Sequence, residues 1–197
     1  LAGNYTNNNS GTFTHNSGTV ILNGSSQQTL AGTMNGGSAF NNLTVTNNSG
    51  NEGTPSVIFN ATTTVNGTST FTTASTTLQF LASSTLTSTN INWNGQAAGT
   101  KIKLRSSASS TTTWLLNVSA AGSQTVTNVD AKDSDASAGD EIASADGTNT
   151  NSGGNTNWVF TITAPKATST ANDTLEINGA STTISNINLT GGAGSPA

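Results

Sequence analysis

The architecture of this chain follows from one short stretch near its start, Gly11-Thr-Phe-Thr-His-Asn-Ser-Gly-Thr-Val-Ile-Leu-Asn-Gly24. Val20 and Leu22 are separated by one residue, and successive side chains of a β-strand point to opposite faces. One face of this strand is therefore expected to be buried and the other wet. The same apolar pair recurs in a polar background at Val57 and Phe59, Leu78 and Phe80, and Ile102 and Leu104.

The composition of the 197 residues favours a folded and exported protein. Thr, Ser and Asn dominate, Pro occurs three times, and the many β-branched residues argue against disorder. Because there is no Cys, stability must come from backbone ladders and stacked side chains. The chain begins with Leu and without a basic or apolar leader, so we expect a processed or excerpted piece of an extracellular protein.

Charge and hydropathy argue against two classes of partner. Only 7% of the residues are charged and the net charge is −4, so a row of phosphates cannot be neutralised and no nucleic-acid partner is expected. No apolar run approaches the roughly 20 residues that span a bilayer, so no membrane span is expected. The partners that we predict are copies of this chain and, as a further class, surface glycans.

Short strand-like units recur in groups of about three, and no segment shows helical spacing. Asn-Gly pairs at Asn23, Asn35, Asn66 and Asn94 predict turns in which a left-handed backbone is easily adopted. Three short strands per turn predict an all-β fold of the parallel β-helix (β-solenoid) type, with irregular coils of about 22–30 residues. The alternative is an antiparallel β-sandwich, which usually has strands of about five or six residues.

The coils are expected to enclose a narrow apolar interior. Trp93, Trp114 and Trp158 are in phase with apolar neighbours, which favours core positions over the alternative of stacking on sugar rings. The predicted interior consists of Phe13, Val20, Leu22, Leu30, Phe40, Leu43, Val45, Phe59, Val65, Phe71, Phe80, Leu86, Trp93, Leu104, Leu116, Val126, Phe160 and Ile162.

The chain is predicted to divide near Pro165, because proline cannot donate a hydrogen bond to a central ladder. Residues 1–164 would form the β-solenoid. Residues 165–197 would form a terminal coil or a strand segment that reaches another subunit.

Two parts of the chain resemble repeats of known surface proteins. Their segments are Gly11–Gly24, Gln28–Gly32 and Phe40–Thr46 in the first part, and Trp114–Val118, Val129–Ala136 and Asn155–Trp158 in the second. They are similar to the right-handed parallel β-helix repeats of bacterial extracellular proteins of the filamentous adhesin or surface-fibre type. The resemblance implies a β-solenoid and a cell-surface location more than it implies an activity.

The ends of a solenoid suggest a function, because each end leaves unpaired backbone groups and apolar side chains. No amphipathic capping helix is recognisable at either terminus. We therefore predict a structural subunit of an extracellular filament or surface fibre, which self-associates through solenoid ends or by strand exchange. The alternative is an adhesin or glycan-binding segment of a larger cell-surface protein. The predicted contact residues are Tyr5, Phe13, Leu175, Ile177, Ile184, Ile187 and Leu189.

Carboxylates gather between residues 130 and 141. Several hard oxygen ligands on one loop are typical of a Ca²⁺ site, although the spacing of an EF-hand loop is absent. The alternative is a solvated acidic turn, and no other metal or cofactor is predicted. The residues concerned are Asp130, Asp133, Asp135, Asp140 and Glu141.

A row of cations precedes the acidic cluster. Lys101, Lys103 and Arg105 alternate with Ile102 and Leu104, so all three should point outward from one strand. The row is interpreted as a wet strand face, with contact to an acidic loop of a neighbouring subunit or to an anionic glycan as alternatives.

No reactive centre is recognisable, so we expect no enzyme. His15 is the only histidine, so a Ser-His-Asp arrangement could form only around this residue, which adjoins a turn. A polysaccharide-active enzyme would need grouped carboxylates with basic partners, and Lys132 alone stands near the acidic cluster.

Overall fold

The computed structural model describes residues 1–8, 11–108 and 112–161, which belong to one compact unit, Leu1–Ile162. Helix is limited here to two 3₁₀ turns, η1 (Gly36–Ser38) and η2 (Ala98–Thr100). In this part of the chain, no helix has the length and apolarity to cross a bilayer. The predicted terminal segment, residues 165–197, lies outside the described residues. So do the predicted core residue Ile162 and the predicted contact residues Leu175, Ile177, Ile184, Ile187 and Leu189.

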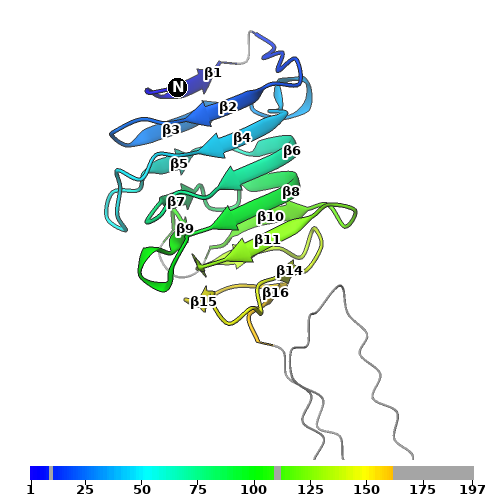
Figure 1. The fold of residues 1–197 in the computed structure, drawn as a ribbon. Coiled ribbons are helices and arrows are strands. Elements are labelled where there is room, and N and C mark those ends of the chain that lie inside the picture. Colours follow the sequence, from blue (N-terminus) through cyan, green and yellow to red (C-terminus); the bar gives the residue numbers. More distant parts are fainter. Residues whose placement is uncertain (9–10, 109–111, 162–197) are drawn as a thin grey trace, which may run out of the picture. The chain divides into compact units, whose positions relative to one another are not determined.

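Two large sheets and one small sheet make up the fold (Figure 1). The first sheet is formed by β1 (Tyr5–Asn7), β3 (Gln28–Gly32), β5 (Val57–Phe59), β7 (Thr77–Phe80), β9 (Ile102–Ser106), β12 (Val129–Ala131) and β15 (Thr150–Asn151). The second sheet is formed by β2 (Thr19–Leu22), β4 (Asn42–Val45), β6 (Thr63–Phe71), β8 (Thr85–Asn94), β10 (Trp114–Val118), β11 (Gln124–Thr127) and β13 (Ser134–Asp135). The small sheet pairs β14 (Ile142–Ala143) with β16 (Trp158–Val159).

The chain passes alternately through the two large sheets, and each passage adds a strand beside the preceding one. We call one pass of the chain through both large sheets a circuit. All pairings between the described strands are parallel. The alternative of an antiparallel β-sandwich is therefore wrong, because hairpin-linked neighbours would pair antiparallel. An all-β fold with parallel sheets is confirmed.

The two longest strands, β6 and β8, each pair in two parts. Thr63–Val65 of β6 pairs with the beginning of β8, and Thr68–Phe71 with its end, and the register shifts between the two parts. The first part of β8 then pairs with β10, and the second part with β11. Together with its strand in the first sheet, a circuit in this region therefore contains three short pairing segments.

The circuits vary in length over a wider range than the sequence predicts. Asp130 lies opposite Thr150, which closes a short circuit, whereas Ile91 lies opposite Gln124, which closes a much longer one. The strands must stay in register for their ladders to form, so the additional residues are placed in the connecting loops.

The interior contains most of the residues that the sequence predicts. Phe13, Val20 and Phe160 are only half-buried, because they lie near the first and last strands, where packing is one-sided. The other predicted core residues in the described part of the chain are buried. The predicted interior list leaves out Met34, Ala39, Ile91, Val118, Val129, Ala131, Ala136 and Ile142. It also leaves out Val57, Leu78, Ile102 and Trp114, although their spacing from apolar neighbours indicated burial.

Aromatic rings stack along the interior. Phe59 lies opposite Phe80 in the parallel register, and their ring centroids are 4.7 Å apart. The other side of Phe80 stacks on Trp114 at 4.1 Å. All three side chains are buried, so the stack replaces water with close ring contacts.

The Asn-Gly pairs differ from the predicted left-handed turns. Of their glycines only Gly36 has a positive φ, 53°. A Cβ at Gly67, which lies within β6, would come 2.8 Å from the carbonyl oxygen of Asn41, and a Cβ at Gly95 would clash with that of Asn128. These two glycines therefore allow the backbones of adjacent circuits to approach closely.

Truncation of Phe80 to alanine should destabilise the fold by about 3–5 kcal/mol, because the ring contacts on both sides are lost in a closed interior. Leu81→Ala is the matched control, since Leu81 is the next residue and is 37% exposed. It should cost at most about 1 kcal/mol. Urea unfolding followed by circular dichroism measures both values, and equal losses would contradict the described packing.

Candidate functional site

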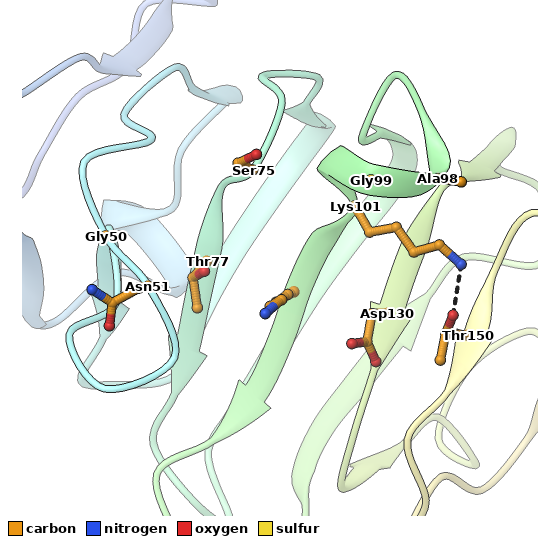
Figure 2. Close-up of a pocket in the computed structure, with 10 residues that line it drawn as sticks. Gly50, Asn51, Ser75, Thr77, Ala98, Gly99, Lys101, Asp130 and Thr150 are labelled. Atoms are coloured by element: carbon orange, nitrogen blue, oxygen red, sulfur yellow. Dashed lines mark hydrogen bonds between the residues drawn. The ribbon is translucent and has the colours of Figure 1, made fainter.

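A polar groove of about 510 Å³ lies on the outward side of the first sheet (Figure 2). Strands β7, β9, β12 and β15 contribute to it, together with the loop before β5 and the loop that contains η2. Apart from Ala98, the residues that line it are polar or glycine. Prominent among them are Asn51, Ser75 and Thr77 on one side, and Lys101, Asp130 and Thr150 on the other.

Parallel register sets the order of side chains along the groove. Thr77 lies opposite Lys103, Lys103 opposite Asp130, and Asp130 opposite Thr150. Neighbouring strands of a sheet are about 4.8 Å apart, and residues in register point to the same face. A hydroxyl, an ammonium, a carboxylate and a second hydroxyl therefore follow one another across four strands.

Arg105 connects the groove to the loop that carries Glu52. Its Nη2 donates to Glu52 Oε1 and to Asp130 Oδ2, each at 2.7 Å, and its Nε donates to Glu52 Oε1 at 2.9 Å. Its Nη1 donates to the carbonyl oxygen of Asp130 at 2.8 Å. The Arg105 side chain is only 13% exposed, so this pairing holds a loop, β9 and β12 together in a partly desolvated setting.

Arg105 lowers the pKa of both carboxylates that it contacts. Hydrogen bonds and charge from Arg105 hold the pKa of Glu52 below its ordinary value. Burial alone would raise the pKa of Asp130, but hydrogen bonds from Arg105 and from the Ser152 hydroxyl outweigh it, so this pKa is lowered as well. Asp130 Oδ1 accepts the Ser152 bond at 2.6 Å. Three cations and two carboxylates therefore leave one positive charge at the groove.

The two lysines keep hydrogen-bonding capacity. Lys101 Nζ donates to Thr150 Oγ1 at 2.6 Å, and Lys103 Nζ lies 3.4 Å from Glu52 Oε2. An ammonium group has three donors, so each lysine can bind further acceptors. Among the described residues, the carboxylates that form ion pairs contact Lys103 and Arg105, and none of them pairs with Lys101.

The outward direction of the basic row is confirmed by the burial of Ile102 and Leu104 between its members. The acidic contact of the row is made within one chain, by Glu52 and Asp130. Sequence reasoning did not connect Glu52 with the row. A signal was present, because Glu52 is the only charged residue among the first 100.

The structure does not bring the five predicted Ca²⁺ ligands together. Asp130 faces Arg105, whereas Asp135 accepts hydrogen bonds from the backbone and the hydroxyl of Ser137, which lower its pKa. Asp140 Oδ2 accepts a bond from Gln124 Nε2 at 3.2 Å. In the described ranges no group of three or more His, Asp or Glu side chains could hold a metal ion. The five predicted ligands are Asp130, Asp133, Asp135, Asp140 and Glu141.

The tryptophans belong to the interior. Trp93 and Trp114 have no exposed surface, so the core interpretation is confirmed for them and the sugar-stacking alternative is wrong. Trp158 is half-buried and stacks on Trp93 at 6.5 Å. His15 is half-buried, and its Nδ1 accepts a hydrogen bond from the Ser17 backbone within a turn.

Two predicted contact residues form an aromatic cluster near β1. Tyr5 and Phe13 are half-buried, and their rings meet edge to face at 5.8 Å. Each also meets the buried Phe40 edge to face, at 5.4 Å and 5.6 Å respectively. Burial raises the pKa of the Tyr5 hydroxyl.

Acid should weaken the native state through Glu52 and Asp130. Their pKa values in the folded protein lie below the ordinary 4.5 and 3.8, so the unfolded state takes up more protons as the pH falls. The stabilisation is present above these ordinary values and is lost as the pH falls through the lowered ones. Urea midpoints measured between about pH 7 and about pH 2 report this loss.

Arg105→Gln should remove the largest lowering contribution to both pKa values and lower the free energy of unfolding at neutral pH by about 1–3 kcal/mol. The loss of stability in acid that comes from Glu52 and Asp130 should then become smaller or change sign. Lys132→Gln removes the same charge from a residue outside the groove lining and should keep the acid dependence of the native sequence. An unchanged acid dependence in Arg105→Gln would contradict this account.

Comparison with known proteins assigns no function to this geometry. No protein-family model, no curated protein sequence and no solved structure matches the chain. The resemblance to bacterial surface repeat proteins stays a prediction from the segments that carry it. The function has to be argued from the strands and side chains themselves.

Proposed function

We propose that the chain is a structural segment of an extracellular filament or surface fibre, folded as a right-handed β-solenoid. The observation that carries this proposal is the order of the first sheet, in which every circuit adds one parallel strand beside the last. Connections between parallel strands of one sheet are nearly always right-handed, which favours that hand. Such a sheet can be extended by further parallel strands through the same backbone hydrogen bonds that join its own strands.

The end strands supply the surfaces for extension. In the described part of the chain, β1 is paired only with β3, and β15 only with β12. An edge strand presents unpaired backbone groups to a further strand, from a second copy or from an adjoining coil. Beside the β1 edge, the half-buried Tyr5 and Phe13 offer apolar area that such a neighbour would cover.

An extracellular setting is supported by the chemistry of the chain. It has no Cys to be oxidised, and its outward strand positions are rich in Thr, Ser and Asn. Its five Lys and Arg residues offer trypsin few cleavage sites. A protein with this composition would keep its backbone hydrogen bonds intact and its surface hydrated outside the cell.

Electron microscopy of the purified chain over a range of concentrations tests the proposal. We expect uniform fibres that lengthen with concentration, because edge pairing between copies is governed by mass action. Isolated particles at every concentration would contradict self-association.

Thr6→Lys should shorten or abolish these fibres, since Thr6 is the exposed central residue of the edge strand β1 and charge discourages edge pairing. Thr44→Lys is the matched control, because it places the same charge in β4, between two paired strands. Fibres of equal length in both variants would exclude β1 as the joining edge. Circular dichroism verifies that both variants fold.

A further inference from the structure

The groove has a charge opposite to that of the protein as a whole. The chain has a net charge of −4, whereas Lys101, Lys103 and Arg105 outnumber the carboxylates of Glu52 and Asp130 by one. In a chain with five basic residues, three lie together at this place. An anion would find a local attraction here.

The three cations differ in how far their N–H donors remain available to an anionic ligand. The Arg105 guanidinium already donates to two carboxylates and two backbone carbonyl oxygens, so its N–H donors are not available to a phosphate or sulfate. The two lysines remain, Lys101 with a hydroxyl partner and Lys103 with a side chain that is 39% exposed. Each ammonium group is a compact positive charge with free N–H donors, so the two lysines together could bind one carboxylate.

The remaining lining is suited to hydroxyl groups. Figure 2 shows Asn51 and Thr77 across the groove from Asp130 and Thr150. These side chains offer amide, hydroxyl and carboxylate groups, and the lining contains no aromatic or large aliphatic side chain that a peptide ligand would need. The polar row repeats at the strand spacing, about 4.8 Å, so a ligand that extends across the strands meets a new polar group at each step.

We propose that this groove binds an acidic oligosaccharide, with a uronate carboxylate held by Lys101 and Lys103. The sugar hydroxyls bond to Asn51 and Thr150. The site lies on the outward face of the first sheet and includes Thr150 of the edge strand β15. A strand that joins at β1 or β15 would extend the sheet beside that edge and leave its outward face accessible. The inference therefore goes beyond the structural role and does not depend on it.

Isothermal titration of the full chain at low ionic strength tests the inference, with a tetrasaccharide of galacturonic acid as the probe. Cellotetraose is the neutral control of equal length, and inorganic tripolyphosphate is the control for charge alone. We expect binding of the uronate that weakens with added salt, because the contact is partly ionic and lies at the surface. Neither control should bind comparably.

Three substitutions, each of which removes one positive charge, test where the uronate binds. Lys101→Gln and Lys103→Gln should each weaken uronate binding about tenfold, the loss expected for one charged hydrogen bond. Lys132→Gln, outside the groove lining, should bind as the native sequence does. Circular dichroism shows whether each variant folds, and the two groove variants test the site independently.

Several outcomes would overturn the inference. Absence of uronate binding would exclude the site, and equal binding of cellotetraose would exclude recognition of the carboxylate. Equal binding of tripolyphosphate would exclude a saccharide as the group recognised. An equal loss in Lys132→Gln would place the attraction in the overall charge of the chain. None of these results depends on whether fibres form.

Discussion

Backbone hydrogen bonds between successive circuits determine where the side chains of this protein lie. Each strand pairs in parallel with the strand one circuit later, so a residue and its partner in register occupy equivalent positions on the same face. On the inner face this places Phe59 against Phe80. On the outer face it places Thr77, Lys103 and Asp130 in one row. The core and the groove are thus two consequences of the same ladder.

Five of the fourteen charged residues of the chain lie where a loop is held against the first sheet. The loop before β5 reaches the outer face of the sheet, and Glu52 secures it to Arg105. Asp130 completes the arrangement from the next strand. An arginine that is mostly shielded from water needs such partners, since burial of an unpaired charge is costly. The ion pairs of Arg105 therefore fix the shape of the groove, whereas the N–H donors that a ligand could still reach belong to Lys101 and Lys103.

Sequence alone predicts those features that depend on local alternation. The spacing of Val20 and Leu22 predicts a strand, and the spacing of Lys101 to Arg105 predicts an outward basic row. The partnership of Glu52 with Arg105 depends on register between distant strands and could not be derived in the same way. The members of the row that runs from Thr77 through Lys103 and Asp130 to Thr150 follow one another at unequal intervals along the chain, so no fixed period reveals it. Loop lengths absorb this irregularity, and they leave no pattern in the sequence.

The close packing of the Asn-Gly pairs also bears on how the protein ages. Deamidation at Asn-Gly requires the glycine nitrogen to attack the asparagine side chain. At Gly67 and Gly95 this nitrogen donates to a carbonyl oxygen of the adjacent circuit, and at Gly24 it donates to the Gln28 side chain. Gly36 instead lies in an exposed left-handed turn. Among the described residues, three of the four Asn-Gly bonds are thus protected by the fold, and deamidation there should begin at Asn35.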